Sequence, residues 1–395
     1  MRTRCSLLFG AALSMLLIGQ RQALAQSWVR TSAPALPWRS ITMSADASKI
    51  VAAAWDMNGG YIYYSTNGGA TWMAAGVPVA NWISTAGTAD GARWTAALLG
   101  GVLYSSTDSG ATWTPSSSPS DYWNSIACSS DGSTMVGAST MVTGRIYAST
   151  DSGTNWVAAG PAAQWHSVAC SANGTKMIAA AEYGALYMSW NSGASWSPLP
   201  LPADADWFSV ACTADGTKLA AVTDTQSGVF AKPSDSSIYL STNGGLSWSR
   251  SPMTNNWWSV ACSADGTKLV AAGRGTPICT STNWGVTLTP EGGTSNRWQC
   301  VSVSADGNKV LAGAEFDGIY IWQGTPKPVL SVRTSGGAAE ITWPIPSMKF
   351  LLQQTPDLNS TNWTVVTNAP AITNLQYQVS LPAAFATRFY RLALP

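Results

Sequence analysis

The chain has 395 residues, of which only 10% are charged, and its 21 Lys and Arg nearly cancel its 20 Asp and Glu. This composition offers neither the basic stripe of a nucleic-acid-binding protein nor the polybasic segment of a membrane-surface protein. Tryptophan is unusually frequent, with 21 residues, and no long helical period accompanies the abundant Gly, Ser, Thr and Ala. Together these features predict an all-β protein that binds no nucleic acid.

Residues 1–25 have the pattern of a secretory signal peptide. Arg2 and Arg4 give a positive start, residues 7–18 form a short apolar run, and Ala-Leu-Ala at 23–25 is a small-x-small cleavage site. The apolar run is too short to span a membrane. We therefore expect cleavage after Ala25, a secreted or periplasmic mature protein without membrane insertion, and no part for the leader in the fold.

A phrase that begins Trp-x-Ser or Trp-x-Cys recurs seven times after the leader. Successive copies are 44, 41, 42, 42, 50 and 41 residues apart, a period in the range of β-propeller blades. Each repeat reads as four short strands, A to D: the Trp phrase, a small apolar run after an Asp-Gly or Asn-Gly hairpin turn, an Ile-Tyr phrase, and a strand that starts at a second Trp. The seven phrases begin at Trp38, Trp82, Trp123, Trp165, Trp207, Trp257 and Trp298.

The two ends of the repeat array complement each other. The seventh repeat runs through GIYIWQG at 318–324 and stops without a strand D. The missing strand has a match near the N-terminus, where SWVRTSAPALPW at 27–38 aligns with SWSRSPMTNNWW at 247–258. We therefore predict a seven-bladed β-propeller at residues 26–325, closed by an N-terminal strand headed by Trp28, because such closure removes open sheet edges.

A second repeated phrase, Ser-x-Asp/Asn-x-Gly-x-Thr/Ser-Trp, joins strands C and D in six repeats. Ser, Asp and Asn can bond the nearby backbone, Gly supplies a left-handed position, and Trp buries a large surface. The carboxylate position holds Asp in two copies and Asn in four, and Asn is a poor general base and a weak ligand for hard metals. We therefore read the phrase as a structural turn and expect no metal and no cofactor. The copies are STNGGATW (65–72), STDSGATW (106–113), STDSGTNW (149–156), SWNSGASW (189–196), STNGGLSW (241–248) and STNWGVTL (281–288).

These octapeptides resemble the Asp box, or BNR repeat, of sialidases and related propellers. The phrase WFSVACTADGTK at 207–218 and its copies are similar to the photosystem II assembly-factor-like family of exported bacterial propellers. The resemblance covers about residues 26–325 and implies the fold rather than one function, since Asp boxes occur in hydrolases, sorting receptors and assembly factors. The Phe/Tyr-Arg-Ile-Pro motif of sialidases is absent, and LPWRSI at 36–41 is the nearest phrase.

Six cysteines follow the leader. Cys128, Cys170, Cys212 and Cys262 occupy one repeated position in strand A. Equivalent positions in neighbouring packed sheets lie about 10 Å apart, beyond the reach of a disulfide, so we expect these four to be small buried apolar residues. Cys279 and Cys300 do not fit the pattern, and their pairing stays open.

The predicted binding face carries the D–A and B–C loops, which vary between repeats, whereas the A–B and C–D turns are regular. Irregular loops on a regular scaffold usually carry binding, although exposed loops also carry charge for solvation alone. The seven repeat tryptophans could pack between blades or form a rim for sugar stacking. The candidate binding residues are Trp55, Asp56, Arg145, Glu182, Tyr183, Asp224, Arg274 and Phe316 in the B–C loops, and Arg39 and His166 directly after a repeat Trp.

We predict a monomeric, non-catalytic propeller that binds a protein or a glycan on this face. The first alternative is a glycoside hydrolase or sialidase-like enzyme, which would need two acids about 5 to 9.5 Å apart or a cluster of arginines. Asp56, Glu182 and Glu315 are the candidate acids, and the arginines would be Arg39, Arg145, Arg274 and Arg297. The second alternative is an assembly factor for a membrane complex.

After a linker, GTPKP at 324–328, the repeat is absent. Residues 328–395 alternate short strand patterns with turn residues, which predicts a small β-sandwich of fibronectin or immunoglobulin type. The phrases Leu-Gln-Gln-Thr at 352–355 and Phe-Tyr-Arg-Leu at 389–392 resemble C-terminal modules of exported proteins from environmental bacteria. Adhesion, spacing, export sorting and docking onto the propeller all stay open as roles.

Overall fold

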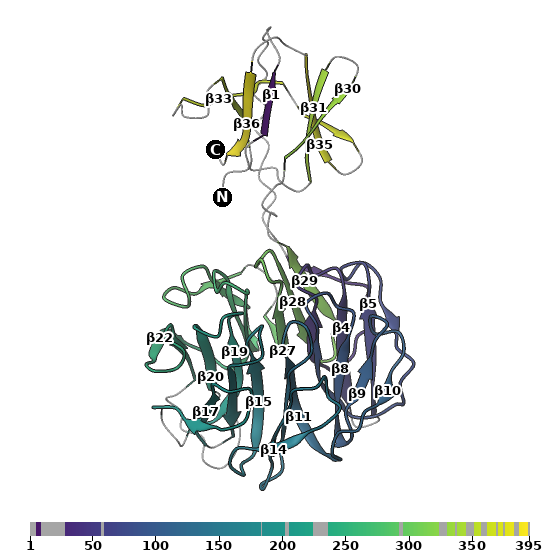
Figure 1. The fold of residues 1–395 in the computed structure, drawn as a ribbon, viewed down its shortest axis with the longest axis vertical. Helices are drawn as coiled ribbons and strands as arrows, with labels where there is room; N and C mark the ends of the chain where they lie inside the picture. Colours follow the sequence, from purple (N-terminus) through teal and green to yellow (C-terminus); the bar gives the residue numbers. More distant parts are fainter. Residues whose placement is uncertain are drawn as a thin grey trace. The chain divides into compact units, whose positions relative to one another are not determined.

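The computed structural model divides into two compact units, Ser27–Gln323 and a second unit formed by Met1–Gln26 with Gly324–Pro395 (Figure 1). All elements among the described residues are β-strands, and none of these residues belongs to a helix that could cross a membrane. The all-β prediction is confirmed. The structure describes residues 5–8, 28–56, 59–182, 184–201, 205–223, 236–291, 295–323, 330–335, 338–344, 351–356, 362–368, 370–373, 376–382 and 387–393.

The unit Ser27–Gln323 consists of antiparallel four-stranded meanders that stand side by side in Figure 1. Three are separate sheets, and the other four are joined in two pairs, because β8 also pairs with β11 and β24 with β27. The first three meanders are β3 (Trp38–Met43), β4 (Ile50–Asp56), β5 (Gly59–Ser65) and β6 (Met73–Ala74); β7 (Trp82–Gly87), β8 (Trp94–Gly101), β9 (Tyr104–Ser106) and β10 (Thr114–Pro115); and β11 (Asp121–Cys128), β12 (Met135–Ser139), β13 (Ile146–Ser149) and β14 (Val157–Ala159).

The four remaining repeats follow the same plan, and the last takes its outer strand from the N-terminus. They are β15 (Trp165–Cys170), β16 (Met177–Ala181), β17 (Leu186–Ser189) and β18 (Ser197–Pro198); β19 (Trp207–Cys212), β20 (Leu219–Thr223), β21 (Ser237–Ser241) and β22 (Ser249–Thr254); β23 (Trp257–Cys262), β24 (Leu269–Thr276), β25 (Cys279–Ser281) and β26 (Thr289–Pro290); and β27 (Asn296–Val303), β28 (Lys309–Ala314), β29 (Ile319–Gln323) and β2 (Val29–Arg30).

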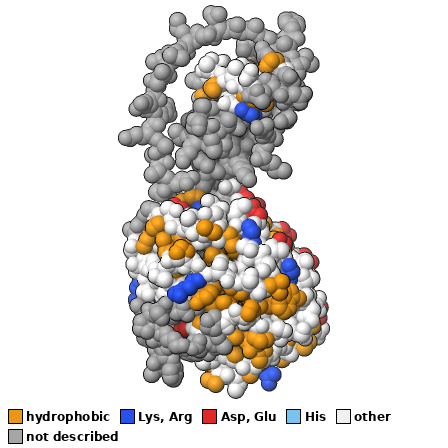
Figure 2. All heavy atoms as spheres, turned by 90° about the vertical axis from the view of Figure 1, so that its left-hand side faces the viewer, with side chains coloured by type: hydrophobic (Ala, Val, Ile, Leu, Met, Phe, Trp, Pro, Cys, Tyr) orange, Lys and Arg blue, Asp and Glu red, His pale blue; other side chains and the backbone are white. Residues whose placement is uncertain are grey.

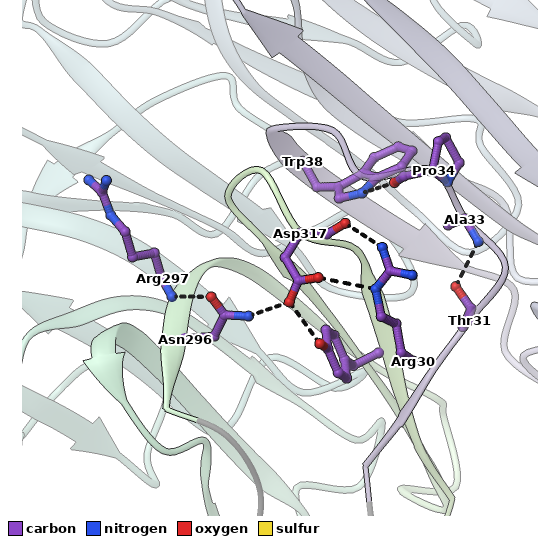
Figure 3. Close-up of polar contacts among 9 residues, drawn as sticks. Arg30, Thr31, Ala33, Pro34, Trp38, Asn296, Arg297 and Asp317 are labelled. Carbon is purple, nitrogen blue, oxygen red and sulfur yellow. Dashed lines mark hydrogen bonds and ion pairs between the residues drawn. The ribbon is translucent and has the colours of Figure 1, made fainter.

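The N-terminal strand is held to the seventh repeat by both backbone and side chains. Val29 and Arg30 pair antiparallel with Ile321 and Tyr320. Arg30 Nε lies 3.1 Å from the Asp317 carboxylate, which also accepts hydrogen bonds from Asn296 and Tyr320 (Figure 3). These bonds lower the pKa of Asp317, against the effect of its partial burial. One carboxylate therefore joins the first strand of the unit to its last hairpin.

Consecutive repeats are linked at the A–B turns by a continuous series of backbone hydrogen bonds. Each turn donates an N–H to the carbonyl of the next repeat at 2.8 to 3.0 Å, beginning with Ala45 to Ala89. The last bond runs from Ala305 back to Ala45, and β27 also contacts β3. The series therefore returns to its start after seven repeats. Its members are Ala45, Ala89, Ser130, Ala172, Ala214, Ala264 and Ala305.

A serine two positions after the repeat Trp makes a second link between sheets. Ser167 Oγ, for example, accepts the Val210 N–H of the next sheet at 3.2 Å. The same bond recurs from Ser40, Ser84, Ser125, Ser209 and Ser259. Cys300 takes the equivalent position in the seventh repeat, which explains one of the two cysteines that do not fit the strand-A series.

The seven repeat tryptophans form a packing layer and not an exposed rim. Each is at most 2% exposed, and Trp165, for example, packs edge-on against Tyr187 of strand C at 5.4 Å. In the sixth repeat Cys279 stands where the other repeats place this aromatic residue, beside Trp257 in one hydrophobic cluster. The sugar-stacking interpretation of these tryptophans is therefore wrong.

The octapeptide is the C–D turn, and Asp and Asn accept the same backbone bond in it. Their second bond differs in direction, because the Thr112 hydroxyl donates to Asp108 whereas the Asn67 amide donates to the Thr71 hydroxyl. Asp108 accepts the Thr112 N–H at 2.9 Å, and Asn67 accepts the Thr71 N–H at the same distance. In the copy that lacks the final Trp, the indole of Trp284 donates to the Ser241 carbonyl of the preceding sheet at 3.1 Å. The repeated phrase therefore acts as a turn whose bonds do not require a carboxylate.

The A–B turns differ in one detail from the expected hairpin. Gly91 has φ 61°, as predicted, and Gly266 has φ 67°, but the preceding aspartates are not among the described residues with positive φ. Asp90 instead accepts bonds from the Thr88 hydroxyl and the Ala92 N–H. The Asp therefore serves as a hydrogen-bond acceptor, and only the Gly supplies the left-handed conformation.

The second unit contains two four-stranded sheets. Ile341 and Val379 of one sheet share a buried cluster with Leu352 and Tyr390 of the other. The backbone of Cys5–Leu8, which belongs to the predicted leader, pairs with the last strand, whereas we had expected no part for the leader in the fold. The strands are β1 (Cys5–Leu8), β36 (Thr387–Ala393), β32 (Leu351–Thr355) and β33 (Thr364–Val365), and β30 (Ser331–Ser335), β31 (Ala338–Pro344), β35 (Gln376–Pro382) and β34 (Ala371–Thr373).

Candidate functional site

A β-bulge recurs directly after every repeat Trp. In the fourth sheet, for example, Trp165 pairs with Ala181 and Ser167 with Ala180, so that His166 has no partner of its own. A bulge re-aims a side chain that would otherwise alternate with its neighbours. The bulged residue of every repeat lines one cavity of about 310 Å³ at the start of the A strands. These residues, here called the bulge set, are Arg39, Ile83, Asn124, His166, Phe208, Trp258 and Gln299.

One side of this cavity is aromatic. His166 and Phe208 have ring centres 4.1 Å apart, and Phe208 and Trp258 have theirs 4.2 Å apart. The guanidinium of Arg274 lies 3.7 Å from the centre of the Trp258 ring, in cation–π geometry. Three consecutive repeats thus provide a continuous aromatic wall of mutually tilted rings that ends in a positive charge.

The other side is polar. Arg39 Nη1 donates to Gln299 Oε1 at 3.5 Å, and the guanidinium lies 5.2 Å from the centre of the Trp55 ring. Burial lowers the pKa of Arg39, and the negative charge of Glu315 partly opposes that effect. Glu315 itself lies 3.0 Å from Arg297 Nε. A partly buried cation therefore lines the cavity, with a nearby carboxylate that is already paired.

His166 is a neutral member of the wall. Its Nδ1 lies 2.7 Å from the Phe208 carbonyl oxygen, and because a carbonyl can only accept, Nδ1 carries the proton. Burial lowers the pKa of His166 to about 4, although the bond to Phe208 acts in the opposite direction. At neutral pH the ring is therefore uncharged, and the fixed positive charge of the cavity comes from arginine.

Four of the predicted binding residues meet at this cavity or on its walls. Arg39 and His166 line it, while Trp55 and Arg274 stack against residues that do. Arg145 lies elsewhere, in a groove of about 470 Å³ that it lines with Asp121, Tyr122 and Tyr147. The four arginines of the sialidase-like alternative therefore do not all converge.

The remaining predicted residues are dispersed. Glu182 follows β16 in the fourth repeat, where burial raises its pKa, and Glu315 follows β28 in the seventh. Neither lines the cavity, so the structure does not bring these two candidate acids together there. Phe316 is 63% exposed and does not line it either. The side chain of Asp56, together with Tyr183 and Asp224, lies outside the described residues.

Sequence reasoning missed Gln299, Asn124 and Ile83 of the bulge set. Gln299 is 4% exposed, and its Nε2 has no hydrogen-bond partner within the described part of the chain. Asn124 donates to the Trp165 and His166 carbonyls of the next sheet. All three directly follow a repeat Trp, as Arg39 and His166 do, so the repeated phrase itself carries the signal.

A second cavity, of about 290 Å³, lies at the opposite end of the same A strands. The four repeated cysteines line it together with the A–B turn residues. Burial raises the pKa of Cys128 and of Cys212 to about 12 and that of the other two thiols as well. Within the described ranges, no group of three His, Cys, Asp or Glu side chains could hold a metal ion. The cysteines form no disulfides, as predicted, but they face this cavity and are only partly buried.

The surface of the larger unit carries few charges. On the side shown in Figure 2, the Lys and Arg side chains lie apart from one another, mostly among hydrophobic and uncharged ones, and Asp and Glu side chains lie along one edge. Exposed apolar side chains of this unit include Tyr122, Val142 and Leu246. The visible charges thus make the cavity, rather than this outer face, the stronger candidate for a binding site.

Comparison with solved structures identifies the fold. The chain is similar to hydrazine synthase of Kuenenia stuttgartiensis (TM-score 0.61, 16% identity, 78% of this chain and 99% of that chain) and to YCF48 of Cyanidioschyzon merolae (0.59, 13%, 75% and 98%). It is also similar to an ancestral GH74 enzyme (0.58, 16%, 81% of this chain and 54% of that chain). These neighbours are β-propellers, so the chain has a propeller-like fold. No protein family model and no curated protein matches the chain.

Proposed function

We propose that the seven meanders are the blades of one closed β-propeller, and that this propeller binds a segment of another protein without catalysis. The series of A–B turn hydrogen bonds that returns to Ala45 supports closure, as does the pairing of Val29–Arg30 with the seventh repeat. The leader pattern supports export, so the binding would take place outside the cytoplasm.

The observation that carries the binding proposal is the bulge set. Every repeat turns one side chain into the same cavity, and these side chains include Arg, Trp, Phe and His. Arg and Trp are enriched among the residues that dominate protein–protein binding energies. A solved structure titled YCF48 bound to D1 peptide is similar to this chain (TM-score 0.57, 13% identity), which adds support for a peptide ligand on such a fold.

The test uses the purified chain without residues 1–25. A displayed peptide library and a glycan array are screened, and each hit is measured by biolayer interferometry against Trp258→Ala and Leu246→Ala. Leu246 is 73% exposed in a C–D turn and serves as the matched control. We expect at least a tenfold loss of peptide affinity with Trp258→Ala and none with Leu246→Ala. Glycan hits alone, or equal affinity for both variants, would contradict the proposal.

The glycoside hydrolase alternative makes a different prediction. It requires two acids on this face, and Glu182 and Glu315 come from the fourth and the seventh repeats. Hydrolysis of β-glucans or aryl sialosides by the purified chain, abolished by Glu182→Gln or Asp56→Asn, would favour that alternative.

A further inference from the structure

We propose that the cavity takes a carboxylate attached to a flat apolar body, with the carboxylate at Arg39 and Gln299 and the body against Phe208 and Trp258. The inference rests on the proposed function and names the ligand chemistry of that same site. The carboxylate could belong to a small organic acid or to the end of a peptide chain, and the experiment below separates the two.

Two buried donors point to the carboxylate. Arg39 Nε and Gln299 Nε2 are both inaccessible to solvent, and neither has a hydrogen-bond partner within the described part of the chain. The two side chains touch through the bond from Arg39 Nη1 to Gln299 Oε1. Buried polar groups are nearly always hydrogen-bonded in folded proteins. Because both atoms are closed off from solvent, an acceptor from outside reaches them when the Arg39 and Gln299 side chains turn toward the cavity that both residues line. A carboxylate offers two oxygens in one plane, which suits an arginine and a neighbouring amide.

The charges described around the cavity favour an anion. Arg39 lines it, Arg274 stacks on its Trp258 wall, and Glu315 contributes a negative charge near Arg39. That carboxylate already pairs with Arg297 at 3.0 Å. Two arginines therefore lie at the cavity or on its wall, whereas the carboxylate near Arg39 is already paired. Since His166 is neutral at pH 7, the surplus of positive charge is carried by arginine.

The aromatic wall indicates the chemistry of the other half of the ligand. Phe208 is 5% exposed, and its ring lies between His166 and Trp258 at about 4 Å from each. Around the cavity, the repeats that supply this wall are followed directly by those that supply Gln299 and Arg39. A cavity of about 310 Å³ matches the lower end of small-molecule sites. An acid with a flat apolar body would thus contact both surfaces at once.

The experiment compares matched acids and amides by isothermal titration calorimetry on the chain without residues 1–25. The first pair is 2-naphthoate with 2-naphthamide, which represents a free acid. The second pair is N-acetyl-L-tryptophan with its amide, which represents a chain end. We expect at least one acid to bind tenfold or more tightly than its amide, as for a lost hydrogen bond to a charged group. Whichever pair shows the larger preference identifies the source of the carboxylate.

Variants locate the binding. Arg39→Gln should remove the preference for acid over amide, and Trp258→Leu should weaken acid and amide alike. Arg145→Gln, in the separate groove, is the control and should change neither. If Arg39→Gln fails to fold, as judged by circular dichroism, Gln299→Met tests the same preference.

Two failures are distinguishable. Equal binding of acid and amide, weakened in both cases by Trp258→Leu, would overturn the carboxylate assignment and leave the cavity as the binding site. No binding of any probe, or binding that Trp258→Leu leaves unchanged, would overturn this inference and, if no peptide binds either, the proposed function as well.

Discussion

The two ends of the A strands use the same backbone repeat in opposite ways. At the A–B turns the seven linking positions hold six alanines and one serine, and each makes the same hydrogen bond to the next repeat at 2.8 to 3.0 Å. At the other end the bulge set holds seven different residue types around one cavity. The residues are thus nearly identical at the positions that make these bonds between sheets, and they all differ at the bulged positions, which the bonds do not involve.

The bulge explains why one end can vary. Because the bulged residue lacks a cross-strand partner, its side chain is not tied to the alternation that buries the Trp before it. Trp207 is fully buried between sheets, whereas Trp258, in a bulge, is only partly buried. Replacing a residue of the first kind should damage the fold, and replacing one of the second kind should damage binding.

The largest expected effect is on stability and comes from a repeat Trp. Trp207→Ala should lower the free energy of unfolding by about 3 to 5 kcal/mol, since it removes a large side chain from a closely packed layer. Trp258→Ala should cost about 1 to 2 kcal/mol, because less apolar area is lost from a partly buried residue. Urea denaturation followed by circular dichroism measures both. Equal losses of unfolding free energy in the two variants would contradict the distinction between the buried repeat tryptophans and the bulge set.

The next largest expected effect is a pH dependence of stability that comes from His166 of the bulge set. His166 is the only histidine, and its folded pKa of about 4 lies below the unfolded value of about 6.5. The unfolded chain therefore binds the proton first, so the stabilisation is complete above pH 6.5 and is lost as the pH falls toward 4. Unfolding at pH 5 should require about 2 kcal/mol less than at pH 7.

His166→Phe is the control for this pH dependence. The variant keeps a flat ring against Phe208 but has no group that titrates between pH 4 and 7. Its unfolding free energy should change less between pH 7 and pH 5 than that of the parent. If the parent and the variant have the same slope, His166 is not the neutral, buried residue that the geometry indicates.

A smaller effect is expected from the serine links. Ser167→Ala removes the acceptor of the Val210 N–H in the next sheet, which should cost about 1 to 2 kcal/mol. Ser117→Ala is a matched control, because the hydroxyl of Ser117 also bonds the next repeat, at the carbonyl of Thr154, but does so in an exposed turn and should cost less than about 0.5 kcal/mol. Thermal unfolding of the two variants side by side would show whether the partly buried bond between repeats is worth more than the exposed one.

Much of the arrangement of strands and turns could be predicted, because its sequence signals lie within single repeats. The period of the Trp phrase predicted the four-stranded meanders. The absence of strand D from the last repeat predicted that an N-terminal strand completes it, and Val29–Arg30 pairs with β29. The octapeptide was predicted as a turn from its Ser, Asp or Asn, Gly and Trp, and the mixture of Asp and Asn indicated a structural role. The strands and the turn depend on bonds within one repeat, and the closing strand was visible because the last repeat lacks it.

The site was less predictable because it depends on distances between repeats. Arg145 and Arg274 were both predicted in B–C loops, yet Arg274 lies within β24 and stacks on Trp258, while Arg145 lies beside Tyr147 in another groove. Gln299 was missed since its significance comes from burial and an unused donor, neither of which is visible in a single residue type. Which of seven equivalent positions meet, and with what partners, is set by packing between sheets.

The smallest expected effect tests whether the octapeptide needs its charge. Asp108 and Asn67 accept the same backbone bond at the same distance, so Asp108→Asn should change the unfolding free energy at pH 7 by less than about 0.5 kcal/mol. Hydrogen bonds from Thr112 hold the pKa of Asp108 at about 2, below its unfolded value. The stabilisation from this carboxylate is thus complete above the unfolded pKa and is lost as the pH falls toward 2.

The reciprocal change, Asn243→Asp, sharpens the same test. Asn243 accepts the Ser247 N–H at 2.9 Å in another copy of the turn. A carboxylate there should also have a lowered pKa and should add less than about 0.5 kcal/mol of stability at pH 7, which disappears in acid. Acid titration of unfolding for both variants should therefore show opposite changes in slope below about pH 4. A large loss at neutral pH in Asp108→Asn would instead mean that the two Asp copies do something the four Asn copies cannot, and the turn at 106–113 would then return as a candidate site in its own right.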